Sequence, residues 1–292
     1  MLKSMRLSAV ACASAVFLVA GSNARAADCG NSGSGFSGFI KEFHREAQAQ
    51  GIGRQALSVL DGITYDPGII KKDRAQNIFS QSFLEFQARM ITDYRIKRGA
   101  ELVQKHKATF ARVEKQYGVP APVIVAFWAL ETDFGANIGD LSTVRSLATL
   151  AWDCRRPEKF RPQLMAALEL IDRGDLHPDE MRGAWAGEIG QTQFLPYDYN
   201  ESAVDFDGDG RRNLRASIPD VLASSANLLR KHGWQPGQPW MQEVRVPRDM
   251  PWEEADIAIQ HPRSQWAKWG VKMANGTPVQ AGEVDLTANV TV

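Results

Sequence analysis

The chain is poor in cysteine and carries no excess of either charge. It has 3 cysteines among 292 residues, and its 34 lysines and arginines balance its 34 aspartates and glutamates. A disulfide-dense scaffold is therefore excluded, and so is binding to nucleic acid through a general basic surface. Its 5 histidines lack metal-ligand spacing, and the motifs of serine hydrolases, nucleotide-binding proteins and dehydrogenases are absent. Any partner must be recognised by a defined site.

The N-terminus has the pattern of an export signal. Lys3 and Arg6 precede an apolar run from Leu7 to Ala20, and a small-x-small sequence ends at Ala26. This pattern predicts a cleavable signal peptide over residues 1–26, because the apolar run is short for a membrane span. An uncleaved N-terminal anchor is the alternative.

Two cysteines remain after this segment, since Cys12 lies within it. In an oxidising compartment, Cys29 and Cys154 are predicted to form a disulfide. It would close a loop of about 125 residues. In the chain-entropy model such a loop is worth roughly 4 kcal/mol. Two separate thiols are the alternative.

Helical periodicity dominates the rest of the chain. The predicted domains are an N-terminal helical region (27–117), a helical core (118–240) and a short C-terminal segment (241–292). A helical region over 77–106 is predicted to place its aromatic stripe in the core. Alternating residues at 243–246 and 284–292 predict strands in the tail. The fold class is therefore mainly α (α+β) with a small, partly β tail. The aromatic stripe consists of Phe79, Phe83, Phe86, Met90 and Tyr94.

Glu131 is the most informative residue of the predicted core. It lies in the last turn of an apolar helix that starts at Pro122 and ends before Gly135, and Phe127 and Trp128 share its face. Apolar burial and the negative end of the helix dipole both disfavour its carboxylate form. A carboxylic acid kept protonated near neutral pH can act as a general acid on a glycosidic oxygen. A solvent-facing glutamate with ordinary titration is the alternative.

Five motifs in order resemble one known family. They are YGVPAPVIVAFWALETDFG, RSLATLAWDCRRPEKFRPQL, GAWAGEIGQTQFLPYDY, AVDFDGDGRRNL and RKHGW. The match to the family is colinear from about Tyr65 to Trp240. The chain thereby resembles the lytic murein transglycosylase B family, which consists of periplasmic enzymes with a lysozyme-like core. The resemblance implies cleavage of the β-1,4 bond between N-acetylmuramic acid and N-acetylglucosamine in peptidoglycan. It also implies a 1,6-anhydromuramoyl product, no cofactor for catalysis, and other cell-wall enzymes as candidate partners.

The resemblance also implies roles for individual residues. Glu131 matches the family's single catalytic glutamate, which serves first as acid and then as base. Gln193 and Phe194 match a stretch that contributes to the saccharide groove, and Tyr199 matches the tyrosine that follows. Predicted substrate contacts are Gln191, Gln193, Phe194, Tyr199 and Trp185.

The sequence departs from the family at three places. Ala184 replaces a serine near the catalytic acid, and Glu188 stands where a small or apolar residue is common. For Glu188 a surface or loop-fixing role is favoured over a second acid, because exposed carboxylates are the default. The chain also ends at Val292 without the family's usual C-terminal segment, so it is predicted to be truncated relative to the family. A catalytically impaired peptidoglycan-binding scaffold and a lysozyme-type hydrolase therefore stay open as alternatives.

An acidic loop at 205–220 resembles the start of an EF-hand. Oxygen ligands stand at positions 1, 3 and 5, and a glycine stands at position 6, but position 12 is Ala216. In the family a longer loop supplies the last acid, and Asp220 is the candidate here. A structural Ca²⁺ ion and a metal-free turn are both compatible with this pattern. The predicted ligands are Asp205, Asp207, Asp209, the backbone carbonyl of Arg211, and Asp220.

Overall fold

The computed structural model describes residues 29–75, 82–256, 258–279 and 287–288. The predicted signal peptide lies outside these residues. Among the described helices, none is long and apolar enough to cross a membrane. The described chain divides into two compact units, one ending at Trp234 and the other beginning at Gln235.

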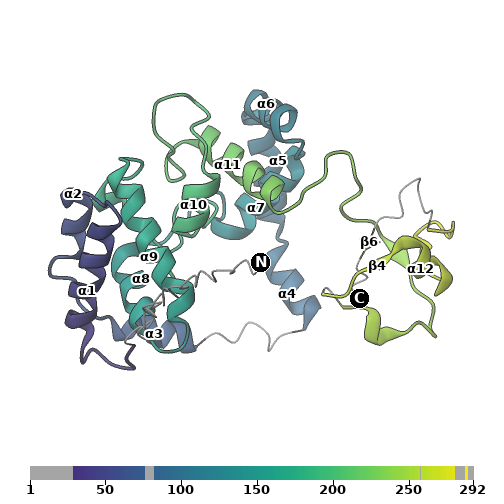
Figure 1. The fold of residues 1–292 in the computed structure, drawn as a ribbon. Coiled ribbons are helices and arrows are strands. Elements are labelled where there is room, and N and C mark those ends of the chain that lie inside the picture. The colour runs from purple at the N-terminus through teal and green to yellow at the C-terminus, as the bar shows by residue number, and fades with distance from the viewer. Residues whose placement is uncertain (1–28, 76–81, 257, 280–286, 289–292) are drawn as a thin grey trace, which may run out of the picture. The chain divides into compact units, whose positions relative to one another are not determined.

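The first unit is almost entirely helical, which confirms the predicted fold class (Figure 1). One short antiparallel ladder joins β1 (Leu141–Ser142) to β2 (Arg182–Gly183). Two short 3-10 turns, η1 (Ser58–Leu60) and η3 (Pro178–Glu180), connect helices. The helices are α1 (Phe36–Ala49), α2 (Arg54–Leu57), α3 (Pro67–Arg74), α4 (Phe83–Met90), α5 (Asp93–Lys105), α6 (Lys107–Tyr117), α7 (Ala121–Thr132), α8 (Thr143–Trp152), α9 (Pro157–Asp172), α10 (Pro196–Ser202) and α11 (Ile218–Lys231).

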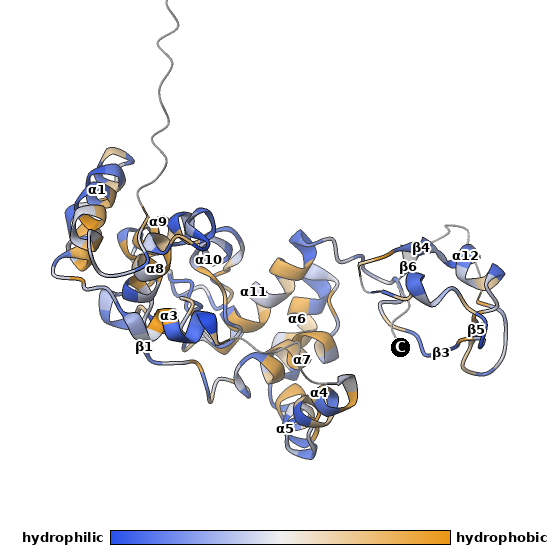
Figure 2. Cartoon of the chain, turned by 90° about the horizontal axis from the view of Figure 1, so that it is seen from below, coloured by the Kyte–Doolittle hydropathy of each residue, from blue (hydrophilic) through white to orange (hydrophobic). Residues whose placement is uncertain are grey.

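One hydrophobic core runs through this unit. Helix α8 packs along α9, which also contacts α2 and α10, while α11 contacts α6, α7 and α10 (Figure 1). Of the residues of α8, all but Arg145 are buried. The core takes residues from both the predicted N-terminal region and the predicted helical core, from Phe36 to Ala226. Helix α1 has hydrophobic and hydrophilic parts (Figure 2), and its buried residues are Phe36, Phe39, Ile40, Phe43 and Ala47.

The predicted disulfide is confirmed, and it fixes the start of the described chain to the end of α8. Cys29 and Cys154 are bonded, with their Cα atoms 5.0 Å apart. Next to this bond, the Gly30 amide donates to the Trp152 carbonyl at 2.9 Å. The Trp152 indole in turn donates to the Ser32 carbonyl at 2.7 Å. The segment that leads into α1 is therefore held by a covalent bond and two hydrogen bonds.

The predicted aromatic stripe over 77–106 is corrected by the structure. This region forms two helices, α4 and α5, because Ile91 takes an extended conformation and Thr92 caps α5 with its hydroxyl. The break interrupts the helical period, so Phe86 is 37% exposed and Tyr94 is 57% exposed instead of lying in the core. The rings of Tyr94 and Phe134 meet in an edge-on arrangement, with 6.5 Å between their centroids. Phe79 lies outside the described residues.

The second unit is small and partly β, as predicted for the tail. Two antiparallel ladders join β3 (Val244–Arg245) to β5 (Lys272–Met273) and β4 (His261–Pro262) to β6 (Thr287–Ala288). It also contains η4 (Trp252–Glu254) and α12 (Arg263–Lys268). Its own core consists of Met250, Trp266, Val271 and Val279.

Candidate active site

Helix α7 carries Glu131 at its C-terminal end. Pro120 occupies the N-cap position and Pro122 lies in the first turn, where a missing N–H costs nothing. Trp128 lies in the core, whereas Phe127 and Leu130 are exposed, so this helix is apolar on its outer side as well. An apolar outer face is unusual for a surface helix and is typical of the wall of a ligand groove.

Glu131 is solvent-accessible, yet its carboxyl group is perturbed. Desolvation by the surrounding protein raises the pKa of Glu131, and repulsion from the Glu188 carboxylate raises it further. The direction is the one predicted from the sequence, whereas the contribution of Glu188 depends on the folded loop. Raising this pKa extends the pH range over which Glu131 is protonated and able to donate a proton.

The neighbouring Asp133 is committed to a structural contact. It ends α7 in the left-handed conformation at φ 50°. Its carboxylate accepts a hydrogen bond from Arg95 Nε at 2.6 Å and one from Asn137 at 3.0 Å. The hydrogen bond from Arg95 lowers the pKa of Asp133, so this group stays ionised. Asp133 therefore anchors α5 to the end of α7 and leaves Glu131 as the protonatable acid of this turn.

The glycine-rich loop from 183 to 196 folds back on itself beside α7. Bridges pair Gly183 with Ile189 and Ile189 with Phe194. The carbonyl of Glu188 lies so close to Gly183 that a Cβ there would be 1.8 Å from the oxygen. Gly190 has φ +81° and lies against the backbone of Leu214. Both positions require glycine for conformational and steric reasons.

Gln191 clamps this loop to the helix that carries Glu131. Its side-chain carbonyl accepts a hydrogen bond from the Trp128 indole at 2.8 Å, and its amide donates to the Arg215 carbonyl at 2.8 Å. The Thr132 hydroxyl donates to its backbone carbonyl at 2.5 Å. Trp128 and Thr132 flank Glu131 on α7, so the loop is fixed to the turn that carries the acid.

The other predicted substrate contacts occupy different environments. Phe194 is buried, and Tyr199 is 0% exposed. The Tyr199 hydroxyl donates to the Arg212 carbonyl at 2.5 Å and accepts from the Leu214 amide at 3.0 Å. Both side chains pack inside the protein and support the loop there. Neither is accessible to a ligand in this structure. Trp185 is partly exposed and packs against the core.

Gln193 differs from its buried neighbours in the loop. It is partly exposed and has φ 53°, a left-handed conformation that a non-glycine residue adopts at a cost of about 1 kcal/mol. Its amide nitrogen donates to the Gly190 carbonyl at 2.9 Å and the Ile138 carbonyl at 3.4 Å. These bonds orient the amide so that its carbonyl oxygen can accept a hydrogen bond from a sugar hydroxyl or amide.

The Glu188 side chain is more buried than the surface role predicted from the sequence would require. Its Oε2 atom is buried and has no hydrogen-bond partner among the described residues. Burial raises the pKa of Glu188, while the backbone N–H groups of Glu188 and Ala186 and the charge of Lys159 act in the opposite direction. The sequence marks Glu188 as unusual only because a small or apolar residue is common at this position in the family.

Three acidic residues of the EF-hand-like loop converge. Ligand atoms of Asp205, Asp207 and Asp209 lie within 4.8 Å of one another. Asp220 is fully buried, and its two oxygens accept hydrogen bonds from the Phe206 amide at 2.7 Å and the Asn213 amide at 2.8 Å. Asp220 thus joins the two ends of the loop, and its role as a metal ligand stays a prediction. A hard oxygen set of this kind fits Ca²⁺.

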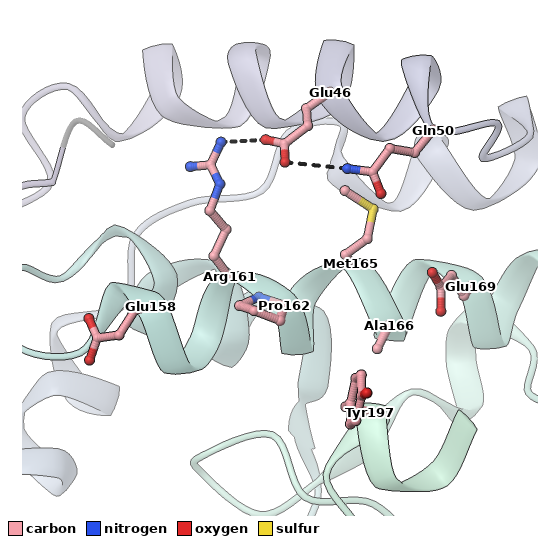
Figure 3. A pocket seen from close by; sticks show the side chains of 9 residues that line it. All are labelled: Glu46, Gln50, Glu158, Arg161, Pro162, Met165, Ala166, Glu169 and Tyr197. Atoms are coloured by element: carbon pink, nitrogen blue, oxygen red, sulfur yellow. Dashed lines mark hydrogen bonds and ion pairs between the residues drawn. The ribbon is translucent and has the colours of Figure 1, made fainter. Parts of the chain in front are cut away.

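Two cavities lie away from Glu131. One lies between α1, α9 and α10, and Figure 3 shows Arg161 of α9 reaching Glu46 of α1 across it. Gln50 contacts the same carboxylate, and Tyr197 borders the cavity from α10 (Figure 3). The other cavity is lined by residues of α1, η1 and the turn that follows, among them His44. Neither of these two cavities is lined by Glu131.

The sequence from residue 35 to residue 291 matches the transglycosylase SLT domain. The chain belongs to this transglycosylase family. The matched range includes the helices of the first unit, Glu131, the glycine-rich loop and most of the second unit.

Individual members of the family are similar in sequence and structure. Membrane-bound lytic murein transglycosylase B of Escherichia coli (strain K12) is 32% identical over 157 residues, which are 53% of this chain and 43% of that protein. The match thus spans less than half of this curated relative. SltB3 from Pseudomonas aeruginosa in complex with NAG-anhNAM-pentapeptide is 37% identical, with a TM-score of 0.82 over 90% of this chain and 70% of that chain. Escherichia coli Slt35 in complex with calcium is 25% identical, with a TM-score of 0.74 over 86% and 79% of the two chains.

Proposed function

We propose that the protein is a periplasmic lytic transglycosylase that cleaves the β-1,4 bond between N-acetylmuramic acid and N-acetylglucosamine, with Glu131 as its single acid and base. The observation that carries this proposal is the position of Glu131, an accessible carboxyl with a raised pKa on the apolar outer side of α7. The similarity to SltB3 supports the substrate class, because that protein is bound to NAG-anhNAM-pentapeptide and to NAG-NAM-pentapeptide.

One carboxyl group is sufficient for this reaction. Protonated Glu131 donates its proton to the glycosidic oxygen, and the bond between that oxygen and C1 of the muramoyl residue breaks. The 6-hydroxyl of the same residue then attacks C1 and returns its proton to Glu131. The nucleophile is part of the substrate, so its effective concentration is high and water is not consumed. The product is a 1,6-anhydromuramoyl end.

The glycine-rich loop, which Gln191 fixes to α7, supplies further residues of the proposed site. Gln193 presents an oriented amide, and Gln191, Phe194 and Tyr199 support the loop from within the protein. Trp185 is partly exposed and offers a flat ring on which a sugar can stack. We therefore assign the direct substrate contacts to Gln193 and Trp185, and a supporting role to the buried residues.

The periplasmic location rests on the substrate and on the oxidised cysteines. Murein lies outside the cytoplasmic membrane, and the Cys29–Cys154 disulfide fits an oxidising compartment. The N-terminal segment with the pattern of a signal peptide provides the route of export.

Release of soluble fragments from purified sacculi tests the proposed function. The active enzyme is expected to convert insoluble murein into soluble muropeptides at a rate that depends on enzyme concentration. A protein that pellets with sacculi and releases no fragments would be the binding scaffold that the replacement of serine by Ala184 keeps open.

A bound Ca²⁺ ion is expected to stabilise the fold without taking part in catalysis. It would be held by Asp205, Asp207 and Asp209, which lie in the loop that Asp220 joins to the start of α11. With a dissociation constant of about 0.1 to 1 mM, 10 mM Ca²⁺ should raise the melting temperature by about 3 to 10 °C. Differential scanning calorimetry with and without the ion measures this shift.

The matched control for calcium is Asp209→Asn. The asparagine keeps an oxygen that can accept the hydrogen bond from the Arg211 amide, which Asp209 accepts at 2.8 Å. This variant should match the wild type in the absence of the ion and lose most of the shift. An equal response to 10 mM Mg²⁺ or no response in the wild type would contradict a calcium site.

A further inference from the structure

The cavity between α1 and η1 has an apolar floor and a cationic rim. Its volume is about 610 Å³, which lies within the usual range of small-ligand sites. One wall is a single face of α1, on which Ile40, Lys41, His44 and Arg45 recur at helical spacing. Ile40 is 8% exposed and Leu60 of η1 is 2% exposed, so both belong to the hydrophobic core. A ligand in this cavity would therefore meet core side chains below and charged groups at the edge.

The other wall is a turn that hydrogen bonds hold in place. The Asp61 amide donates to the Ser58 carbonyl at 3.1 Å, and the Ile63 amide donates to the Leu60 carbonyl at 3.4 Å. Between them, Gly62 has φ +70°, and a Cβ at this position would meet no atom within 4 Å. The turn thus borders open space, and its backbone is fixed in the absence of a ligand.

The cations of the rim have no protein partner in the described part of the chain. Lys41 and Arg45 are exposed, and His44 is partly exposed. Within the described ranges, no ion pair or side-chain hydrogen bond engages any of these three side chains. Asp61 is the acid of the lining, so two permanent cations stand against one carboxylate. A carboxylate is a fitting ligand, because arginine can donate two parallel hydrogen bonds to it.

The cavity between α1, α9 and α10 has the opposite character. Its arginine, Arg161, is already paired with Glu46, as Figure 3 shows. Glu158 and Glu169 line the same cavity, and no cation of the described residues forms an ion pair with either of them. An anionic ligand would be repelled there. Charge therefore favours the cavity with the cationic rim for such a ligand.

We propose that the cavity between α1 and η1 is a second murein-binding site, which takes the free carboxylate end of a peptide attached to the glycan strand. A murein peptide is joined to its sugar through its amino end, so its other end carries the carboxylate of an alanine. Lys41 and Arg45 bind the carboxylate, and the alanine methyl group packs on Ile40 and Leu60. The inference rests on the proposed function for the identity of the ligand.

This site is separate from the proposed active site. Glu131 does not line the cavity, and neither α1 nor η1 belongs to the helix or loop that carries the acid. A second point of attachment raises the concentration of glycan strands near the protein without adding a contact at the scissile bond. The expected consequence is tighter binding to whole murein, with unchanged chemistry on a glycan that lacks peptides.

An NMR titration of the protein with the peptide Nα,Nε-diacetyl-Lys-D-Ala-D-Ala tests the site. This probe has a single charge, its terminal carboxylate, and it contains no sugar that Glu131 could cleave. The backbone amides of α1 and of Gly62 should shift, whereas those around Gln193 should not. The same peptide ending in a carboxamide should bind at least about 10-fold more weakly, because it cannot accept charge-assisted hydrogen bonds.

Substitutions of the rim separate charge from structure. Lys41→Gln combined with Arg45→Gln should also weaken binding of the probe by at least about 10-fold. Asp61→Asn should strengthen it by about 2- to 5-fold, because the repelling acid is removed. A merely structural role of the rim does not produce this gain. The matched control is Lys107→Gln combined with Lys115→Gln, which removes two exposed charges from α6 and should leave the affinity unchanged.

Activity provides a second measurement of the same variants. The Lys41→Gln and Arg45→Gln double variant should need several-fold more sacculi for half-maximal release of fragments. Its kcat/KM on a short glycan without peptides should equal that of the wild type, because Glu131 and Gln193 are intact. Melting temperatures establish that the variants are folded, and the gain from Asp61→Asn still tests the site if the double variant is unstable.

Several outcomes would overturn the inference. Equal affinity for the carboxylate and carboxamide probes would show that the cations do not recognise the ligand. Shifts confined to the region of Gln193, or equal affinity of the wild type and the folded double variant, would place the peptide elsewhere. A wild type that binds the probe at α1 but releases no product from sacculi would contradict the proposed function and support the binding site, so the two failures are distinguishable.

Discussion

Glu131→Gln is expected to lower the rate of muropeptide release by at least about 10³-fold. The amide has nearly the same shape as the carboxylic acid but cannot donate an acidic proton or accept one back. Both proton transfers of the proposed reaction use this one group, so its loss should fall at the upper end of the range for general acid–base catalysis. The measurement is the initial rate of soluble fragment release from sacculi.

The fold and the binding of murein should survive this substitution. The Glu131 side chain is accessible to solvent, so replacing it creates no cavity. The variant should therefore melt within about 2 °C of the wild type and still pellet with sacculi. Asp133→Asn serves as a neighbouring control that retains Glu131. A Glu131→Gln variant with a rate within tenfold of the wild type would falsify the assignment of the acid.

The pH dependence follows from the direction of the pKa shift. The reactive form of Glu131 is protonated, and desolvation and the Glu188 charge both raise its pKa. Activity should therefore persist above the pH at which an ordinary glutamate is ionised. It should then fall as pH rises through the elevated pKa of the folded enzyme.

Removal of the disulfide is expected to lower the free energy of unfolding substantially. The bond between Cys29 and Cys154 spans 125 residues. A loop of this length constrains the unfolded chain by about 4 to 5 kcal/mol in the chain-entropy model. For a chain of this size that corresponds to a fall in melting temperature of about 8 to 20 °C. Thermal unfolding of the double variant Cys29→Ser and Cys154→Ser measures this change.

Reduction of the wild type provides an independent control. The reduced wild type and the double variant should melt at similar temperatures, because both lack the bond and retain the hydrogen bonds around Trp152. The rate constant for glycan cleavage should change little below the melting range, since neither cysteine lies in the helix or loop of the proposed site. An unchanged melting temperature would show that the local hydrogen bonds alone hold the N-terminal segment.

Local patterns were sufficient to predict much of the fold. Proline at the start and a glycine stop placed the helix that carries Glu131. Over 77–106 the helical period predicted one continuous aromatic stripe, whereas the structure has two separate helices. The break at Ile91 and Thr92 has a weak sequence signal, because threonine is also tolerated inside helices.

The site was harder to predict where it depends on contacts between distant residues. Glu131 was identified from its own helix and from the resemblance, whereas the effect of Glu188 on it needs the folded loop. The environment of Tyr199 was also not predictable from its motif. The motif places Tyr199 next to the groove residues, but its hydroxyl is hydrogen-bonded inside the protein to the backbone of Arg212 and Leu214.

The acidic loop shows what spacing can and cannot specify. The short-range pattern placed Asp205, Asp207 and Asp209 together, as the structure has them. The role of Asp220 depends on how the loop closes on α11. Its two oxygens accept hydrogen bonds from the amides of Phe206 and Asn213. Closure of a loop is set by packing across the chain, which a one-dimensional spacing does not contain.

The central claim is tested most directly by the mass of the muramoyl ends released from purified sacculi. If the 6-hydroxyl attacks C1 and Glu131 takes back its proton, every new end is a 1,6-anhydro sugar, one water lighter than a reducing end. Mass spectrometry of the digest should therefore give anhydromuropeptides as the main products. Reducing muramic acid ends as the main products would contradict the account and would instead assign a lysozyme-type hydrolysis to this site.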